Sequence, residues 1–183
     1  GDEVWFQELA EKNHAMLKQR GVRKILTQCP HCMNSLTHDY PQFGDQFEVV
    51  HHTEFLQQLI DDGKLAAPER TGSVTYHDPC YLARVNGVHQ APRDLLGDGI
   101  SEMGQRREKT FCCGAGGGRM WMEEEADQRV SVLRAKEAIE TGAETVAVGC
   151  PFCLTMMTDG VKSCGSVAKV EDVAENLAKR LGL

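Results

Sequence analysis

Short apolar runs alternate along the chain with longer stretches in which apolar residues recur every three or four positions. The short runs predict β-strands and the longer stretches predict amphipathic α-helices. Strands are expected at 24–27, 47–50, 73–76, 110–111, 144–148 and 167–170. Helices are expected at 3–20, after Pro30, at 54–61, 81–84, 91–96 and 121–141, after Pro151 and at 172–181. This order predicts an α/β fold of repeated βα units, with a mostly parallel sheet and helices on both faces.

One internal repeat is visible in this pattern. Residues 22–33 resemble residues 144–154, because each segment runs from a short predicted strand into Cys-Pro-x-Cys and follows a helix that ends in glycine. Two copies of one unit would place two such loops at the carboxyl ends of parallel strands, where open α/β sheets bind their ligands. We therefore predict a pseudo-duplicated chain folded as one α/β domain.

Composition narrows the classes of function. The 183 residues are 41 % hydrophobic and 26 % charged, which is ordinary for one globular domain. A net charge of −7 without a long basic cluster argues against a nucleic-acid partner. No window approaches the ~20 consecutive apolar residues of a membrane-spanning helix, so we expect a soluble piece with no direct membrane span. The chain begins at Gly1 rather than at methionine, and we expect it to be part of something longer.

Eight cysteines are a high number for a chain without a secretory signal, and such thiols usually bind metal or do redox chemistry. Five of them fall into three groups, and each group is predicted to follow a strand. If those strands are parallel neighbours, their ends bring five thiols to one edge of the sheet. The five are Cys80, Cys112, Cys113, Cys150 and Cys153.

The adjacent pair Cys112-Cys113 favours a multi-iron cluster over a single ion, because consecutive side chains of a strand point to opposite faces. Gly114, Gly116 and Gly117 belong to a glycine run whose N–H groups are candidates for binding the cluster. Nearby apolar side chains are candidates for excluding water from it, although such a patch is more often core. These are Phe111, Met120, Trp121, Met122 and Phe152.

Simpler interpretations exist for each part. A lone C-x-x-C is often a structural zinc site or a thioredoxin-like redox pair, and a glycine run is more often a flexible loop. Convergence of five cysteines favours iron–sulfur over zinc.

Histidines near the predicted strand ends are secondary candidates. His77 is a candidate for orienting the cluster loop or relaying protons, whereas Asp78 is expected to cap the helix that begins at Pro79. One of His51 and His52 could face the cluster edge, but a solvent-exposed loop position is the commoner outcome. His31 could be a substitute metal ligand, yet Phe152 at the same repeat position favours packing.

Two further features have simple interpretations. Cys164 lies outside every motif and is expected to be a plain thiol. The acidic residues 123–125 are expected to open the helix at 121–141, where negative charge suits the helix dipole, although a docking surface for an electron donor is the alternative.

Three sequence segments carry a resemblance: YHDPCYL at 76–82, FCCGAGGGRMW at 111–121 and CPFCLTM at 150–156. With these spacings, the chain resembles the cysteine-rich CCG domain of heterodisulfide reductase and its relatives. It is most similar to the bacterial heterodisulfide-reductase-related membrane proteins that accept electrons from electron-transfer flavoprotein during fatty-acid oxidation. The resemblance covers nearly the whole chain.

The resemblance implies two motifs, each with five cysteines able to ligate a 4Fe-4S-type cluster, non-cubane in some members. By position, the five cysteines above form the complete second motif, in a repeat at 71–183. Cys29 and Cys32 match only the last pair of the first motif, so 1–70 is expected to be the remainder of a first repeat. These two cysteines would bind nothing, bind adventitious zinc, or form a disulfide.

The resemblance also implies a function. The chain would be the electron-transfer module of a larger oxidoreductase, inactive alone, that passes electrons from electron-transfer flavoprotein to a membrane quinone through domains outside this chain. The full-length protein would lie in the cytoplasm at the inner face of the bacterial membrane. The alternatives are a cluster-based disulfide (heterodisulfide) reductase and a structural zinc or docking module.

Overall fold

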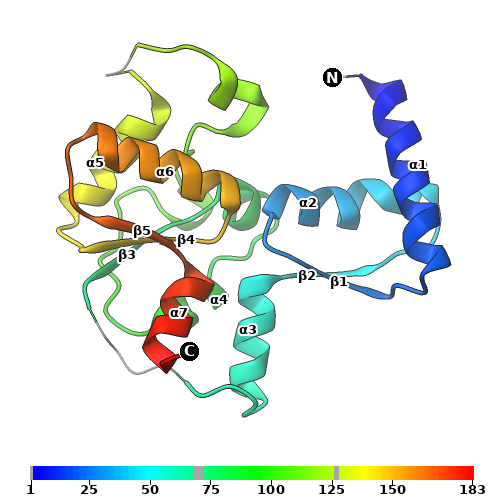
Figure 1. Cartoon of the computed structure of the whole chain (residues 1–183), viewed down its shortest axis with the longest axis horizontal. Coiled ribbons are helices and arrows are strands. Elements are labelled where there is room, and N and C mark those ends of the chain that lie inside the picture. The colour runs from blue at the N-terminus through cyan, green and yellow to red at the C-terminus, as the bar shows by residue number, and fades with distance from the viewer. Residues whose placement is uncertain (1, 68–71, 126–127) are drawn as a thin grey trace.

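Two small parallel sheets form the frame of the computed structural model, which describes residues 2–67, 72–125 and 128–183 (Figure 1). The first sheet pairs β1 (Lys24–Thr27) with β2 (Glu48–His51). The second has the order β3-β4-β5, with β3 (Val74–His77), β4 (Thr145–Val148) and β5 (Lys169–Asp172). All three strand pairs within these sheets are parallel.

The central strand β4 explains why the second sheet is covered on both faces. Val146 and Val148 are fully buried in a cluster with residues of the helices that precede and follow β4 in the chain, whereas Ala147 is buried in a second cluster. Successive side chains of a strand point to opposite faces, so the continuous apolar run of β4 needs cover on both sides. Figure 1 shows α5 (Val130–Glu140) and α6 (Pro151–Ser163) on one face and α4 (Ala91–Leu96) and α7 (Val173–Leu181) on the other.

The smaller sheet carries its own helices. α1 (Glu3–Gln19) precedes β1, and α2 (Pro30–Asn34) follows it and continues into a π-helical turn, η1 (Ser35–Asp39), and a 3₁₀ turn, η2 (Tyr40–Phe43). We call residues 2–67, with the smaller sheet, the first unit, and residues 72–125 and 128–183, with the larger sheet, the second unit. α3 (His52–Asp61) follows β2 and packs against α4 and α7 of the second unit. The Nε2–H of His52 donates to Oδ1 of Asp172 at 2.9 Å, which fastens the two units together.

The α/β class and the parallel strands are confirmed, and several boundaries match. The strands nevertheless divide between two sheets, and the predicted repeat boundary at 70/71 lies outside the described residues. The expected strand at 110–111 is wrong, because this segment is a loop after the 3₁₀ turn η4 (Arg107–Lys109).

The expected helix at 121–141 is also wrong in its first half. A 3₁₀ segment, η5 (Gly116–Trp121), precedes it, and within this segment Gly117 and Gly118 have φ values of 65° and 74°. The α-helix begins only at Val130, so the acidic residues 123–125 do not open it. Glu123 and Glu125 are exposed, and the buried face of the helix starts with Ser131 and Val132.

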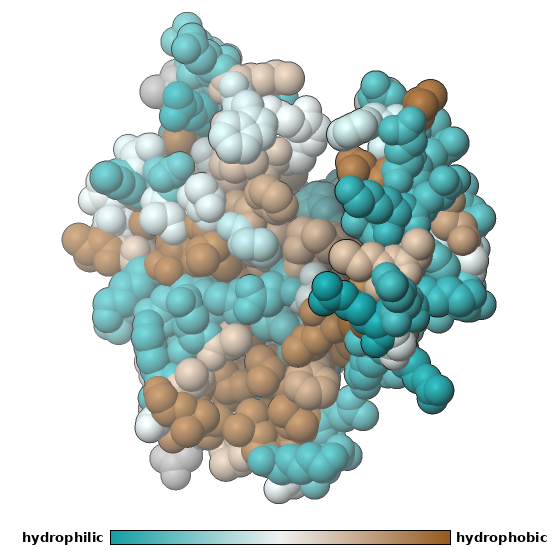
Figure 2. Space-filling model, turned by 45° about the vertical axis from the view of Figure 1, so that its right-hand side comes forward, coloured by the Kyte–Doolittle hydropathy of each residue, from teal (hydrophilic) through white to brown (hydrophobic). Residues whose placement is uncertain are grey.

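No helix within the described ranges is long and apolar enough to cross a membrane. Hydrophilic residues dominate the right-hand part of the face in Figure 2, where α1 lies, and apolar groups are interspersed elsewhere.

Candidate metal centre

Five cysteine side chains from three separate segments meet beside the carboxyl ends of β3 and β4. Cys80 begins the short π-helical turn η3 (Tyr81–Val85), and Cys150 is the N-cap of α6. Their thiols form one chain of contacts, from Cys80 to Cys112, Cys113, Cys153 and Cys150. The Sγ atoms of Cys153 and Cys113 are 3.3 Å apart. The structure therefore brings together the five residues that the sequence singled out.

The donor set fits a metal cluster chemically. All five cysteines are free, and Cys113, Cys150 and Cys153 are buried. The contact with Cys113 lowers the pKa of Cys112, and the contact with Cys153 lowers the pKa of Cys150 to about 5. The pKa of the neighbouring thiol shifts in the opposite direction, because the contact with Cys112 raises the pKa of Cys113 to about 12. Five adjacent thiolates would repel one another, so full deprotonation needs positive metal ions among them.

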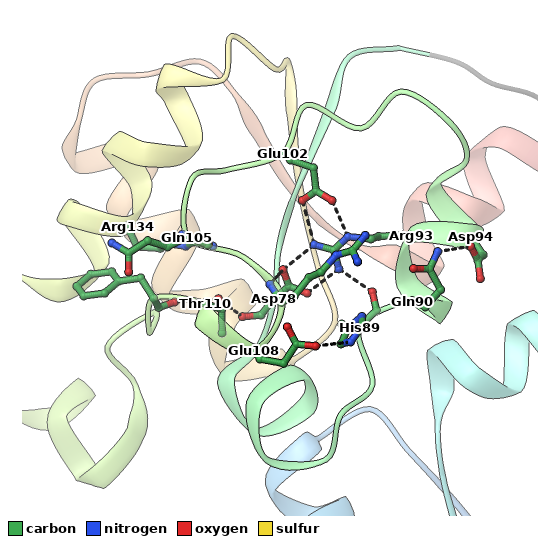
Figure 3. A network of polar contacts seen from close by, with 12 residues as sticks. Asp78, His89, Gln90, Arg93, Asp94, Glu102, Gln105, Glu108, Thr110 and Arg134 are labelled. Carbon is green, nitrogen blue, oxygen red and sulfur yellow. Dashed lines mark hydrogen bonds and ion pairs between the residues drawn. The ribbon is translucent and has the colours of Figure 1, made fainter.

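A buried ion-pair network, drawn in Figure 3, holds the loop that carries Cys112 and Cys113. The guanidinium of Arg93 in α4 donates to both carboxylate oxygens of Asp78 at 2.8 Å, and it also binds Glu102. The hydroxyl of Thr110 donates to the backbone carbonyl of Asp78 at 2.9 Å. Residue 110 is therefore tied directly to the end of β3, and no strand is needed to bring the cysteine pair to the site.

Asp78 does not cap a helix as expected, because its carboxylate is committed to this network. Besides Arg93, it accepts the backbone N–H of Arg107 at 2.9 Å. Arg107 has a φ of 54°, a left-handed conformation that costs a non-glycine residue about 1–2 kcal/mol. The contact with Asp78 helps to offset that strain at the turn before the cysteine pair.

Gly114 is required by the geometry of the site. Its φ is 90°, and a Cβ atom there would lie 3.0 Å from Cβ of Val130. Its N–H donates to Sγ of Cys112 at 3.3 Å. Gly116 and Gly117 are exposed, so their role in cluster binding stays a prediction.

His77 is fully buried at the end of β3. One of its ring nitrogens lies within 4.8 Å of Sγ of both Cys113 and Cys153. Its Nδ1 accepts a hydrogen bond from Nε of Arg134 at 2.9 Å, and burial lowers the pKa of the imidazole to about 3. The ring is therefore neutral, and it faces the thiols.

The sequence interpretation missed Arg134. This side chain has an exposed fraction of 0 % in the middle of α5, and it also donates to the carbonyl of Gln105 at 2.9 Å and pairs with Glu137. A signal was present, because Arg134 lies at helical spacing between the buried residues Ser131 and Ala138.

The other two candidate histidines are buried, so the expectation of an exposed loop position is wrong. The Nε2–H of His51 donates to the carbonyl of Gln28, and its Nδ1 accepts from the hydroxyl of Thr53 at 2.8 Å. A Cβ atom on Gly149, the residue before Cys150, would lie 3.6 Å from the His51 ring. His51 thus supports the strand end behind the site.

His31 packs as expected and also touches the thiols. Its ring lies 4.2 Å from that of Tyr81 and 5.9 Å from that of Phe152, measured between centroids. Hydrogen-bond contacts with Cys150 and with Cys29 raise the pKa of His31 to about 9. The Cys-Pro-x-Cys loop of the first unit therefore lies directly against the five-cysteine site of the second.

Cys29 and Cys32 are free, and Cys32 is exposed. The one set of three closely spaced metal-ligand atoms within the described ranges is that of His77, Cys113 and Cys153. The expectation of zinc at Cys29 and Cys32 is therefore not supported. Cys164 is half-buried beside the carbonyl of Val132, in keeping with a plain thiol.

A hollow of about 310 Å³ adjoins the site. The residues around it are the glycine run 116–118 together with His31, Ala115, Met120, Trp121 and Phe152. Trp121 is 81 % exposed and Met122 is 62 % exposed, so these two side chains do not shield the thiols as expected.

Comparison with known proteins agrees with this geometry. The chain is 44 % identical over 98 % of its length to a probable iron–sulfur-binding oxidoreductase, FadF, of Bacillus subtilis, and spans 26 % of that protein. It is 42 % identical over 99 % of its length to the EtfAB:quinone oxidoreductase of Syntrophomonas wolfei, and spans 27 % of it. Identity to one subunit of the dihydromethanophenazine:CoB–CoM heterodisulfide reductase of Methanosarcina mazei is 40 %, over 97 % of the chain and 45 % of that subunit.

These names confirm the expected relation to iron–sulfur oxidoreductases, and they support an iron–sulfur cluster rather than zinc as the cofactor. The family model of the cysteine-rich domain called CCG matches residues 1–37 and 74–158, which include all five cysteines and also Cys29 and Cys32. The chain belongs to the cysteine-rich CCG domain family.

Proposed function

We propose that Cys80, Cys112, Cys113, Cys150 and Cys153 bind one 4Fe-4S-type cluster, cubane or non-cubane. The observation that carries this proposal is the unbroken chain of contacts among five free thiols. Thiolates are the usual protein ligands of such clusters, and a bound cluster supplies one-electron transfer. Gly114 donates its N–H to Sγ of Cys112, and Gly116 and Gly117 are proposed as further backbone donors.

The cluster would carry electrons within a larger oxidoreductase. The printed name of the Syntrophomonas relative favours electron-transfer flavoprotein as the donor and a quinone as the acceptor. A further relative, from Chromohalobacter salexigens, is named a probable membrane-anchored ferredoxin, which favours membrane association of the whole protein, and we propose the inner face. Because the chain spans about a quarter of these relatives, the other parts of the whole protein would provide the membrane and quinone contacts.

A second function, disulfide cleavage at the cluster, is favoured by one observation. The hollow beside His31 and the glycine run borders the site where Cys150 lies, and it has room for a small organic group. Several relatives are named subunits of a heterodisulfide reductase.

The test is anaerobic reconstitution with iron and sulfide. The 183-residue chain should acquire close to four irons and four sulfides for a cubane cluster, with visible absorption and a paramagnetic signal in one redox state. Cys112→Ser and Cys150→Ser should each lose most of the iron and sulfide. Cys164→Ser is the matched control and should keep the wild-type content. A wild-type chain that binds no iron and sulfide, or that binds zinc alone, would exclude the proposal.

Anaerobic reconstitution of the whole protein separates the two functions. If electron transfer is correct, reduced electron-transfer flavoprotein should reduce the cluster and a soluble quinone should reoxidise it. Reoxidation by a small disulfide would instead favour disulfide cleavage, with two clusters oxidised and two protons taken up for each pair of thiols released.

A further inference from the structure

Arg134 fixes the proton of His77 at one ring nitrogen. Its Nε–H donates to Nδ1 at 2.9 Å, and a guanidinium cannot accept a hydrogen bond. Nδ1 must therefore be unprotonated, and a neutral imidazole then carries its proton on Nε2. Arg134 itself is held by Glu137 and by the carbonyl of Gln105, so the arrangement is rigid and buried.

The Nε2 atom of His77 is buried and has no hydrogen-bond partner among the described residues. An unsatisfied buried N–H costs about 1–3 kcal/mol, so a fully buried donor without a partner needs an explanation. The sulfur atoms of Cys113 and Cys153 lie within 4.8 Å of a ring nitrogen of His77, and Cys112 interacts with the ring electrostatically. A thiolate is an acceptor, and it would satisfy this donor once the thiols are deprotonated.

The same spacing would also suit a metal ligand, but the contact with Arg134 argues against this role. A neutral histidine that ligates through Nε2 must carry its proton on Nδ1. That proton would point at the N–H of Arg134, and two donors cannot form a hydrogen bond with each other. Ligation through Nδ1 would require breaking the 2.9 Å bond to Arg134.

We propose that His77 is a positioning residue whose Nε2–H donates a hydrogen bond to the sulfur of Cys113 or Cys153, with Arg134 setting the tautomer. This inference rests on the proposed function, because it assumes that these cysteines hold an iron–sulfur cluster. A hydrogen bond to a cluster thiolate stabilises the more negative, reduced state and raises the reduction potential. His77 therefore sets the potential of the cluster without ligating it.

The experiment compares His77→Phe and His77→Gln with the wild-type chain after anaerobic reconstitution. Iron and sulfide content should stay at the wild-type level in both variants, because no ligand is lost. At a fixed solution potential, the ratio of reduced to oxidised cluster should fall about tenfold in His77→Phe, equivalent to 59 mV for a one-electron couple. Glutamine keeps a donor and an acceptor at similar spacing. The ratio of reduced to oxidised cluster in His77→Gln should therefore lie between those of the wild-type chain and His77→Phe.

A spectroscopic readout tests the contact itself. Electron–nuclear double resonance of the wild-type protein, prepared in H₂O and in D₂O, should show an exchangeable proton that is absent from His77→Phe. With ¹⁵N-labelled histidine, the nitrogen coupling should be weak. A strong nitrogen coupling and loss of iron in His77→Phe would make His77 a ligand and overturn the proposal.

Arg134 provides an independent variant. Arg134→Met removes the donor to Nδ1 and releases the tautomer, so it should lower the potential in the same direction as His77→Phe. Adding Arg134→Met to His77→Phe should then produce little further change. His38→Phe, an exposed histidine bonded to Asn86, is the control and should leave the potential unchanged.

The possible failures are distinguishable. A wild-type chain without a cluster would overturn the proposed function and this inference together. A loaded wild-type chain whose potential is the same in His77→Phe would overturn only the role of His77. If His77→Phe does not fold, shown by loss of its circular dichroism, His77→Gln and Arg134→Met decide by the same measurements.

Discussion

Histidines near the cysteines and at the strand ends differ in what their neighbours do to the pKa of the imidazole. The contacts with Cys150 and Cys29 raise the pKa of His31, whereas burial lowers the pKa of His51 to about 4. The electrostatic interaction with His52 also lowers the pKa of His51, and the interaction with Asp172 raises it. The sequence shows a histidine at each position, but not which of them will be charged, because that depends on residues far away in the chain.

The lowered pKa of His51 predicts how the stability of the chain depends on pH. An unfolded histidine takes up its proton near pH 6.5, and folded His51 does so only near pH 4, so the unfolded state binds more protons between these values. The free energy of unfolding should therefore fall as the pH drops from 7 to 4, with roughly 2 kcal/mol from this residue between pH 7 and pH 5.

His51→Gln should remove that share of the acid sensitivity, because glutamine can contact Gln28 and Thr53 without titrating. The measurement is urea unfolding of the metal-free chain at pH 7 and pH 5, with His38→Gln as the exposed control. An unchanged difference between the two pH values in His51→Gln would show that His51 does not titrate in this way.

The apolar pattern predicted the bounds of strands and helices well where the apolar side of the element packs in the core around a sheet. The bounds of α4 and β1 agree with the sequence expectation, β4 and α7 begin one residue later than expected, and β3 is shifted by one residue at both ends. The segment 110–125 could not be predicted in this way, because hydrogen bonds to Asp78 and left-handed glycines shape it. The site residues were predictable from cysteine spacing, whereas Arg134 and the Asp78–Arg93 pair depend on contacts between distant elements.

Close packing of α5 on α6 depends on one glycine. A Cβ atom on Gly160 would lie 2.5 Å from the backbone oxygen of Ser131 and 3.0 Å from Cβ of Ala135. Because the nearest obstacle is backbone, Gly160→Ala should push the helices apart and destabilise the chain by about 1–3 kcal/mol, despite the better helix propensity of alanine.

Gly104→Ala is the matched control for this change. Its added Cβ would meet only the carboxylate end of Glu137, at 3.3 Å, which can move. Thermal unfolding of both variants checks the prediction. Equal melting temperatures for Gly160→Ala and Gly104→Ala would mean that the two helices can separate without cost.

At the scale of the whole molecule, the two units share an interface that includes the cluster site. His52 reaches Asp172 across it, and α3 packs on α4 and α7. His31 brings the loop of the first unit against Cys150 and stacks on Tyr81, the residue after Cys80. The first unit therefore forms one wall of the site, whether or not it holds iron itself.

This arrangement allows a test of whether the first unit contributes ligands. His31 contacts both Cys29 and Cys150, and the five-cysteine chain of contacts is complete without Cys29. Cys29→Ser and Cys32→Ser should therefore keep the iron and sulfide content of the wild-type chain, whereas Cys150→Ser should lose most of it. Parallel anaerobic reconstitutions with metal analysis measure this directly. A loss of iron in Cys29→Ser as large as in Cys150→Ser would mean that the cluster takes a ligand from the first unit, and that the interface closes around the metal.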